Sequence, residues 1–369
     1  MPVFNPFSFG KIINNGNTVN KIYNRGTKIY DKDAYTTLVV WTTGTSDNRF
    51  TIQNSTSTPI SEFWFDGIKQ PNPTGNSYIS AGAQTKTLTG THIVKIKGVF
   101  NLYGSSTVNT NCNINIINFQ QDLTQLIYTF YNCVNLKGII PQLPNSLTNM
   151  SNTFNGCNKL TGNIPDLPNT LTTLFYTFNN CSGLNGNIPS LPSTLTSMQD
   201  AFYGCKGLTG NIPSLPSTLT NMSFAFGLCS NLTGVIPTIP SGIINLQYAF
   251  ANCSKLTSLQ TPIANLNALT NMQGTFSGCT SLSINSIDLS TNTVLTIFQP
   301  FYNGVAYTTN TLTSVILGNT PFTGSSPQVV VANSNMSASA LNALFNSLPT
   351  VTGKTINCKG CPGSGCLLY

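Results

Sequence analysis

Hydrophobic positions recur with a constant period of about 24 residues through the middle of the chain. A Phe, a Cys three residues later and a Leu three residues after that return in phase seven times, and only the last copy comes two residues late. The repeated positions are Phe130, Phe154, Phe178, Phe202, Phe226, Phe250 and Phe276 together with Cys133, Cys157, Cys181, Cys205, Cys229, Cys253 and Cys279. One unit has too few apolar residues to close a core by itself. The pattern therefore predicts coils that stack and bury one another's faces.

The path of each coil is indicated by its prolines and glycines. Paired prolines such as Pro189 with Pro192 and Pro213 with Pro216 exclude a helix from the return limb and favour an extended backbone. A Gly two residues after each Leu, as at Gly210, marks a tight turn. We predict a coil made of a short strand, a turn and an extended return, and a solenoid of about seven such coils over residues 111–300.

The regular cysteines admit two interpretations, a metal or disulfide framework and a stack of buried thiols. One Cys per coil places neighbours along one edge of the stack, which does not form a tetrahedral cluster. Disulfides between successive coils would join the cysteines two by two and break the uniform repeat. The spacing favours small buried thiols that fill space, so no metal or cofactor is expected there.

Polar and apolar residues alternate over residues 36–110, where strands at 37–41, 50–52, 62–65 and 92–97 predict a β-sandwich. Residues 1–35 contain two short strand pairs around the turn signals Asn15-Gly16 and Arg25-Gly26. Residues 301–369 are expected to cap the stack with one amphipathic helix over 337–348, followed by Pro349. The fold class predicted is mainly β, with a solenoid between an immunoglobulin-like sandwich and a C-terminal cap.

Charge and candidate chemistry argue against an enzyme. Charged residues make up 7% of the chain, with 16 Lys+Arg against 9 Asp+Glu and no Arg cluster, so no nucleic-acid site is expected. His92 is the single histidine and sits at an aromatic strand position, where a packing or surface residue is expected rather than a general base or metal ligand. No Ser-His-Asp or Cys-His constellation can be assembled, and no catalytic residue is predicted. Paired carboxylates could still perform glycoside chemistry, but Asp166, Asp200 and Asp288 occupy different phases of the repeat, which disfavours this alternative.

Two further features bear on location and metals. No apolar run is long enough to span a bilayer, and no charged segment precedes an apolar one at the N-terminus, so we expect synthesis in the cytosol without membrane insertion. Cys358, Cys361 and Cys366 would need a fourth ligand, such as Cys112, to hold zinc. No metal is therefore predicted at the C-terminal end either.

The segment 271–292, with its Phe-x-x-Cys-x-x-Leu unit, resembles the BspA-like leucine-rich repeats of bacterial surface proteins. Trp64-Phe65-Asp66-Gly67 and the strand around His92 are similar to PKD-like immunoglobulin-fold domains, with Phe65 in place of Gly and His92 in place of Tyr. The echo of Lys11-Ile12 in Lys21-Ile22 resembles short N-terminal β-segments of bacteriophage tail and fibre proteins, although any small β-meander would give the same pattern. The first resemblance implies the fold and leaves the ligand open.

Extracellular-type modules and an adhesive repeat array without a recognisable export signal favour a virion protein made in the host cytoplasm. Residues 1–35 would dock to other virion proteins, the sandwich would act as a spacer, and the solenoid would meet a host surface glycan or protein; a homo-oligomer is possible. The alternatives are a bacterial surface adhesin and a structural capsid or collar protein without a ligand. Within the repeat, the positions that change from coil to coil carry Tyr176, Phe224 and Tyr248. Aromatic rings beside amides and hydroxyls suit sugar or protein surfaces, so these three are the predicted binding residues.

Overall fold

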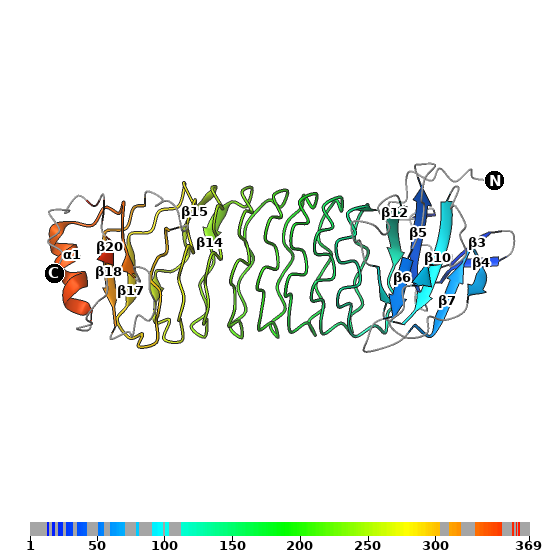
Figure 1. The fold of residues 1–369 in the computed structure, drawn as a ribbon, viewed down its shortest axis with the longest axis horizontal. Helices are drawn as coiled ribbons and strands as arrows, with labels where there is room; N and C mark the ends of the chain where they lie inside the picture. The colour runs from blue at the N-terminus through cyan, green and yellow to red at the C-terminus, as the bar shows by residue number, and fades with distance from the viewer. Residues whose placement is uncertain are drawn as a thin grey trace. The chain divides into compact units, whose positions relative to one another are not determined.

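Over the residues that it describes, the computed structural model is mainly β with one short helix (Figure 1). It divides into two compact units, residues 1–171 with 176–185 and residues 172–175 with 186–369. Both units contain coils of the repeat. The structure describes residues 13–14, 17–18, 21–24, 27–31, 35–42, 51–54, 60–70, 79–80, 91–98, 100–102, 112–302, 310–318, 329–348, 356–357, 359 and 361.

The first unit begins with two antiparallel hairpins. β1 (Ile13–Asn14) pairs with β2 (Asn17–Thr18), and β3 (Lys21–Asn24) pairs with β4 (Thr27–Asp31). The strand pairs predicted on either side of the two turn signals are confirmed, whereas the turn residues lie outside the described residues.

Two sheets follow in this unit. One has the order β13-β12-β5-β10-β7-β8 and the other the order β11-β6-β9. The four strands predicted for residues 36–110 are confirmed as β5, β6, β7 and β10, with ends that differ by one or two residues. The strand bounds are β5 Thr36–Thr42, β6 Thr51–Asn54, β7 Glu62–Phe65, β8 Ile68–Gln70, β9 Ile79–Ser80, β10 Thr91–Lys97, β11 Phe100–Asn101, β12 Cys112–Asn118 and β13 Leu136–Lys137.

One strand is shared by the six-stranded sheet and the first coil. β12 pairs antiparallel with β5 along most of its length, and Ile114 and Asn115 pair in parallel with Leu136 and Lys137 of β13. The division expected at residue 110 is therefore not a break in the sheet. Because β12 satisfies the backbone groups on the open side of the first coil, this sheet closes the N-terminal end of the coil stack.

Successive coils are joined by parallel bridges. In the first unit these link Gln125 to Asn149, and in the second they run from Thr173 through Ser197, Asn221, Asn245 and Asn271 to Ile297. The prediction of a short strand in every coil is wrong for most coils, which have a one-residue bridge at this position. Several residues of a coil donate to the carbonyl three residues before them, as Ala225 N does to Met222 O at 3.0 Å and Cys229 N to Phe226 O at 3.1 Å. These turns bend the backbone and prevent an extended strand from continuing.

In the second unit, the described strands begin at Gly234 and continue into its C-terminal part. They pair in parallel, β14 with β15, β16 with β17, β17 with β18, and β19 with β20. Their bounds are β14 Gly234–Ile236, β15 Leu256–Leu259, β16 Ile263–Ala264, β17 Ser286–Leu289, β18 Ser314–Leu317, β19 Val329–Val330 and β20 Ile356–Asn357.

The core of the coils is a column of rings beside a column of thiols. All seven repeat phenylalanines have no exposed surface. Their rings stack nearly parallel within each unit, for example Phe130 on Phe154 at 5.5 Å and Phe202 on Phe226 at 5.6 Å between centroids. The seven repeat cysteines are buried and free of disulfides, and Cys229 donates from Sγ to the carbonyl of Phe202 at 3.0 Å. The thiols of Cys157, Cys181, Cys253 and Cys279 likewise donate to the carbonyl of the repeat Phe in the preceding coil.

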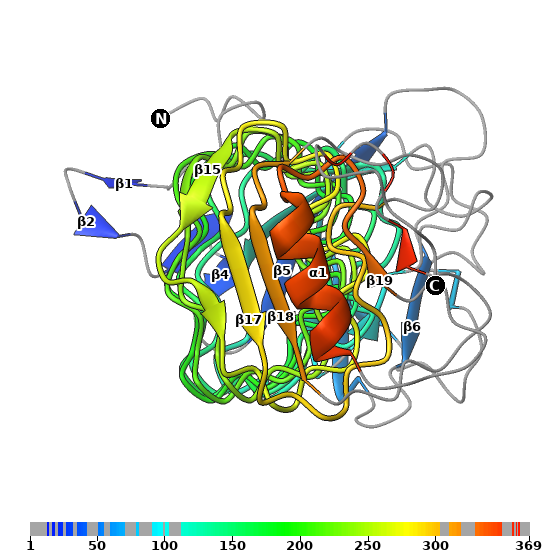
Figure 2. The ribbon, with the colours of Figure 1, turned by 90° about the vertical axis from the view of Figure 1, so that its left-hand side faces the viewer.

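The predicted C-terminal helix is confirmed as α1 (Ala338–Ser347), which packs against β18 (Figure 2). Ser337 caps it by accepting from Ala340 N at 3.2 Å, and Leu341 and Leu344 turn inward. Pro349, Cys358 and Cys366 lie outside the described residues, whereas Cys361 is buried and free. Within the described part of the chain, no group of His, Cys, Asp and Glu could hold a metal, and no helix has the length and apolar character to cross a membrane.

Candidate functional site

One position in each coil, two residues before the repeat Phe, has a left-handed backbone. Its φ lies between +50° and +61° in every coil. This conformation costs a bulky L-residue about 1–2 kcal/mol, whereas Gly adopts it freely and Asn or Asp readily. The seven residues, which we call the left-handed row, are Tyr128, Asn152, Tyr176, Asp200, Phe224, Tyr248 and Gly274.

Hydrogen bonds around the row hold this backbone in place. In the coil of Phe224, the side chain of Asn221 accepts from Ser223 N at 2.9 Å, which tightens the turn just before the row position. Phe224 N then donates to Gln247 O of the next coil at 2.8 Å. The following coil repeats the arrangement around Tyr248. The ladder between coils, rather than the side chain at the position, therefore sets the left-handed conformation.

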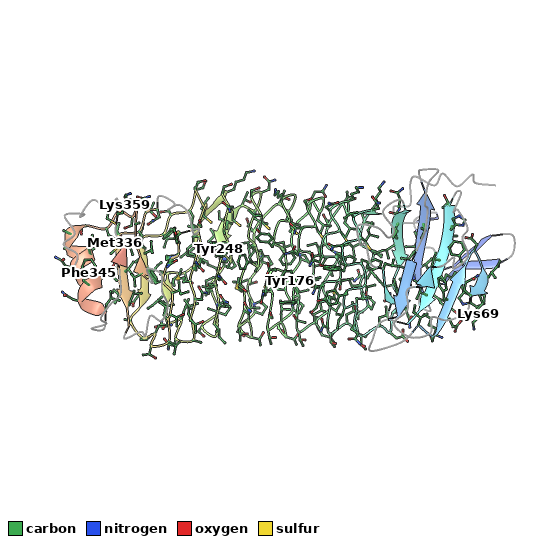
Figure 3. The ribbon with its side chains drawn as sticks, viewed as in Figure 1. Lys69, Tyr176, Tyr248, Met336, Phe345 and Lys359 are labelled. Carbon is green, nitrogen blue, oxygen red and sulfur yellow. The ribbon has the colours of Figure 1, made fainter. Side chains whose placement is uncertain are left out.

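Aromatic side chains gather at the row in the second unit. The rings of Phe224 and Tyr248 stack at 5.0 Å and 26°, and Tyr203 meets Phe224 edge to face at 6.0 Å. Tyr248 lies against Gly274, where a Cβ atom would overlap its ring. Partial burial raises the pKa of Tyr248, and the nearby Tyr302 raises it further. Tyr203, Phe224, Tyr248 and Tyr302 are all half-buried, so part of each side chain is accessible to solvent. Tyr248 is labelled in Figure 3.

Amide groups flank these rings. Gln247 Nε2 donates to Gln273 Oε1 at 3.0 Å, and Asn221 Nδ2 donates to Gln199 Oε1 at 3.2 Å. Apolar edges beside neutral hydrogen-bonding groups provide contact area and direction. This arrangement can bind a partner, but none of these groups is an acid or base suited to proton transfer near neutral pH.

Residues 105–233 and 199–326 match the family model described as "BspA type Leucine rich repeat region", in six copies. The chain belongs to this family. The crystal structure of the T. pallidum leucine-rich repeat protein is similar at 26% sequence identity, over 46% of this chain and 83% of that one, with a TM-score of 0.35. No curated protein matches.

The structure brings together two of the three predicted binding residues of this BspA-type chain. Phe224 and Tyr248 stack in the second unit, whereas Tyr176 belongs to the first, where it is half-buried with φ +53°. The predicted binding residues did not include Tyr128, which occupies the same row position and is 39% exposed. Sequence reasoning missed this residue because nothing local marks its coil as different. It also missed Tyr203, which lies next to the repeat residue Phe202.

The other candidate residues of the BspA-type chain are not members of this aromatic cluster. His92 packs as predicted: its Nδ1 lies 2.7 Å from Asp66 Oδ2, and its ring stacks on Phe65 at 5.0 Å. Asp166 and Asp288 are exposed, whereas Asp200 is buried within the left-handed row.

Proposed function

We propose that this BspA-type protein is a non-enzymatic attachment protein of a bacteriophage virion, and that it meets a host surface through the left-handed row. The observation that carries the proposal is the presence of bulky aromatic residues at a strained position. Asn152 and Gly274 fill the same position at lower backbone cost. Strain of this kind persists where a side chain serves a role other than folding.

The proposal also assigns a role to each remaining part of the chain. The coils form one right-handed solenoid that displays the row. The sheets of residues 36–118 serve as a PKD-like, immunoglobulin-like spacer, and the hairpins of residues 1–35 dock to other virion proteins. The ligand is a host glycan or protein, and the assembly is a homo-oligomer on the particle.

Replacing Tyr176, Phe224 and Tyr248 together by Ser tests the proposal. The variant should fold and lose binding to host cells, measured with labelled purified protein. A matched control replaces Ile139, Val235 and Ile244 by Ser, because these are also apolar coil residues and are 41–48% exposed. Normal binding by the row variant, at unchanged stability, would exclude the row as the contact surface.

A bacterial surface adhesin is the second candidate, supported by the family match to BspA-type repeats. Immunogold electron microscopy separates it from the first. Label on purified phage particles supports the virion protein, and label on uninfected bacterial cells supports the adhesin. Label buried until the particle is disrupted would favour a structural capsid or collar protein without a ligand.

A further inference from the structure

A second surface of the first unit combines aromatic rings with ammonium groups. Trp64 on β7 pairs across the sheet with Lys69 of β8 on one side and with Lys95 of β10 on the other. Since directly paired residues point to the same face, the three side chains form one row, Lys-Trp-Lys, across three strands. Lys69 Nζ lies over the Trp64 ring at 5.8 Å from its centroid.

Glu62 holds the Trp64 ring in place. Its Oε2 accepts from Trp64 Nε1 at 3.2 Å and from the Tyr35 hydroxyl at 2.9 Å, while its Oε1 lies 3.6 Å from Lys97 Nζ. Bonds from Tyr35 and Trp64 lower the pKa of Glu62, so it is ionised at neutral pH. The carboxylate is thus fully engaged in orienting its neighbours.

Positive charge predominates on this surface. Lys69 and Lys97 lie near the carboxylate of Glu62, and Lys69 and Lys95 flank the Trp64 ring. Lys95 Nζ lies over the Tyr35 ring at 5.9 Å, so a second ammonium group also lies on an aromatic face. Contacts between an ammonium group and an aromatic ring at exposed sites contribute only about 0.5–1 kcal/mol. A ligand carboxylate can therefore compete with the ring for the ammonium group.

We propose that the face formed by Tyr35, Trp64, Lys69 and Lys95 binds an acidic polysaccharide that carries uronate groups. Such a chain presents apolar C–H faces of sugar rings and carboxylates in alternation. The C–H face packs against Trp64, and the carboxylates meet the ammonium groups of Lys69 and Lys95 on either side. This site is separate from the left-handed row and does not depend on its function.

Tryptophan fluorescence gives a direct readout, since the chain contains only Trp41 and Trp64. In the full-length Trp41→Phe variant, titration with polygalacturonate should shift or quench the Trp64 emission. Neutral dextran should leave the emission unchanged. Added salt should weaken the emission change caused by polygalacturonate, because salt screens the attraction between solvent-accessible ammonium groups and carboxylates. Polygalacturonate without effect on the emission would overturn the proposal.

Charge-matched variants separate the site from general attraction. Lys69→Ala with Lys95→Ala should weaken binding of polygalacturonate about tenfold. Lys159→Ala with Lys255→Ala removes the same charge from lysines that bind Asn135 and Asn231 in the coils, and should leave binding unchanged. Equal weakening by both pairs, or equal binding of single-stranded DNA, would mean that only net charge is sensed and would reject the site. A normal response in the row variant with three Ser would show that the two surfaces act independently.

Discussion

Phe224 and Tyr248 occupy equivalent positions in adjacent coils, both with a left-handed backbone, and their rings stack with centroids 5.0 Å apart. The hydrogen bonds between coils impose the left-handed conformation on both residues. Stacking of the two rings offsets part of the free-energy cost of that conformation. Substitutions that disturb the rings without breaking this ladder should therefore separate binding from folding.

Gly274→Ala should displace the Tyr248 ring, because the new Cβ would overlap it and φ is +61°. We expect a loss of about 1 kcal/mol of unfolding free energy and weaker binding to host cells. Gly278→Ala is the matched control, since it adds a Cβ at φ +72° against Asn252 instead. It should cost a similar amount by urea denaturation and leave binding intact. An equal loss of binding in both variants would show that displacement of the Tyr248 ring is not the reason for weaker attachment.

Leu228→Asn should stabilise the protein by about 1 kcal/mol in urea denaturation, because Leu at φ +64° is strained and Asn tolerates that region. The equivalent position directly before the repeat Cys holds Asn or Gly in the other six coils. Leu228→Ala keeps the strain and removes the side chain, so it should not stabilise. A stabilising Ala variant would show that side-chain contacts, rather than φ, disfavour Leu228.

Phe202→Ala should cost about 3–5 kcal/mol, since the ring is fully buried and its loss leaves a cavity beside Phe226. Because each coil is packed on its neighbours, hydrogen exchange should rise in the adjacent coils as well. Tyr203→Ala, at a half-buried position, should cost clearly less. A loss for Phe202→Ala below about 1 kcal/mol would contradict the buried column.

The cysteine column should resist thiol reagents in the native protein. Its thiols are buried and donate to backbone carbonyls, so neither contact with a reagent nor ionisation is favoured. Titration with Ellman's reagent should find them unreactive until denaturant is added. Rapid labelling of Cys205 or Cys229 under native conditions would show that the coils open locally.

Stability should fall as the pH rises above about 9, the ordinary pKa range of a thiol. Burial raises the pKa of Cys157, Cys181, Cys229, Cys253 and Cys279, in the last case to about 12. The unfolded chain therefore releases these protons before the native one does, and each thiol lowers the unfolding free energy by up to about 1.4 kcal/mol per pH unit in this range. Urea midpoints measured from neutral pH upward should decline. The midpoints of the Cys253→Ala variant should decline less steeply with pH. An equal slope would show that the Cys253 thiol does not contribute to the decline.

Periodicity along the chain is enough to predict the stacked coils and their core. The in-phase Phe, Cys and Leu positions define which side chains must be buried, because a unit with so few apolar positions can only bury them against another unit. Local periodicity likewise predicts the strands β5, β6, β7 and β10 and the helix α1, because alternating or helically spaced apolar residues place one face of an element in the core. Asn180 and Gly204, directly before their Cys, even indicate the left-handed turn there, since these residue types tolerate it.

The left-handed row, the sharing of β12 and the Lys-Trp-Lys row arise from contacts that form only when the chain folds. Tyr, Phe, Asp and Asn at the row position share no local preference, and the backbone there is set by hydrogen bonds to the next coil, such as Tyr248 N to Gln273 O. In the same way, β12 becomes a cap through pairing with both β5 and β13, and Trp64 meets Lys95 through strand register. Such pairings join residues far apart in sequence, and no local pattern records them.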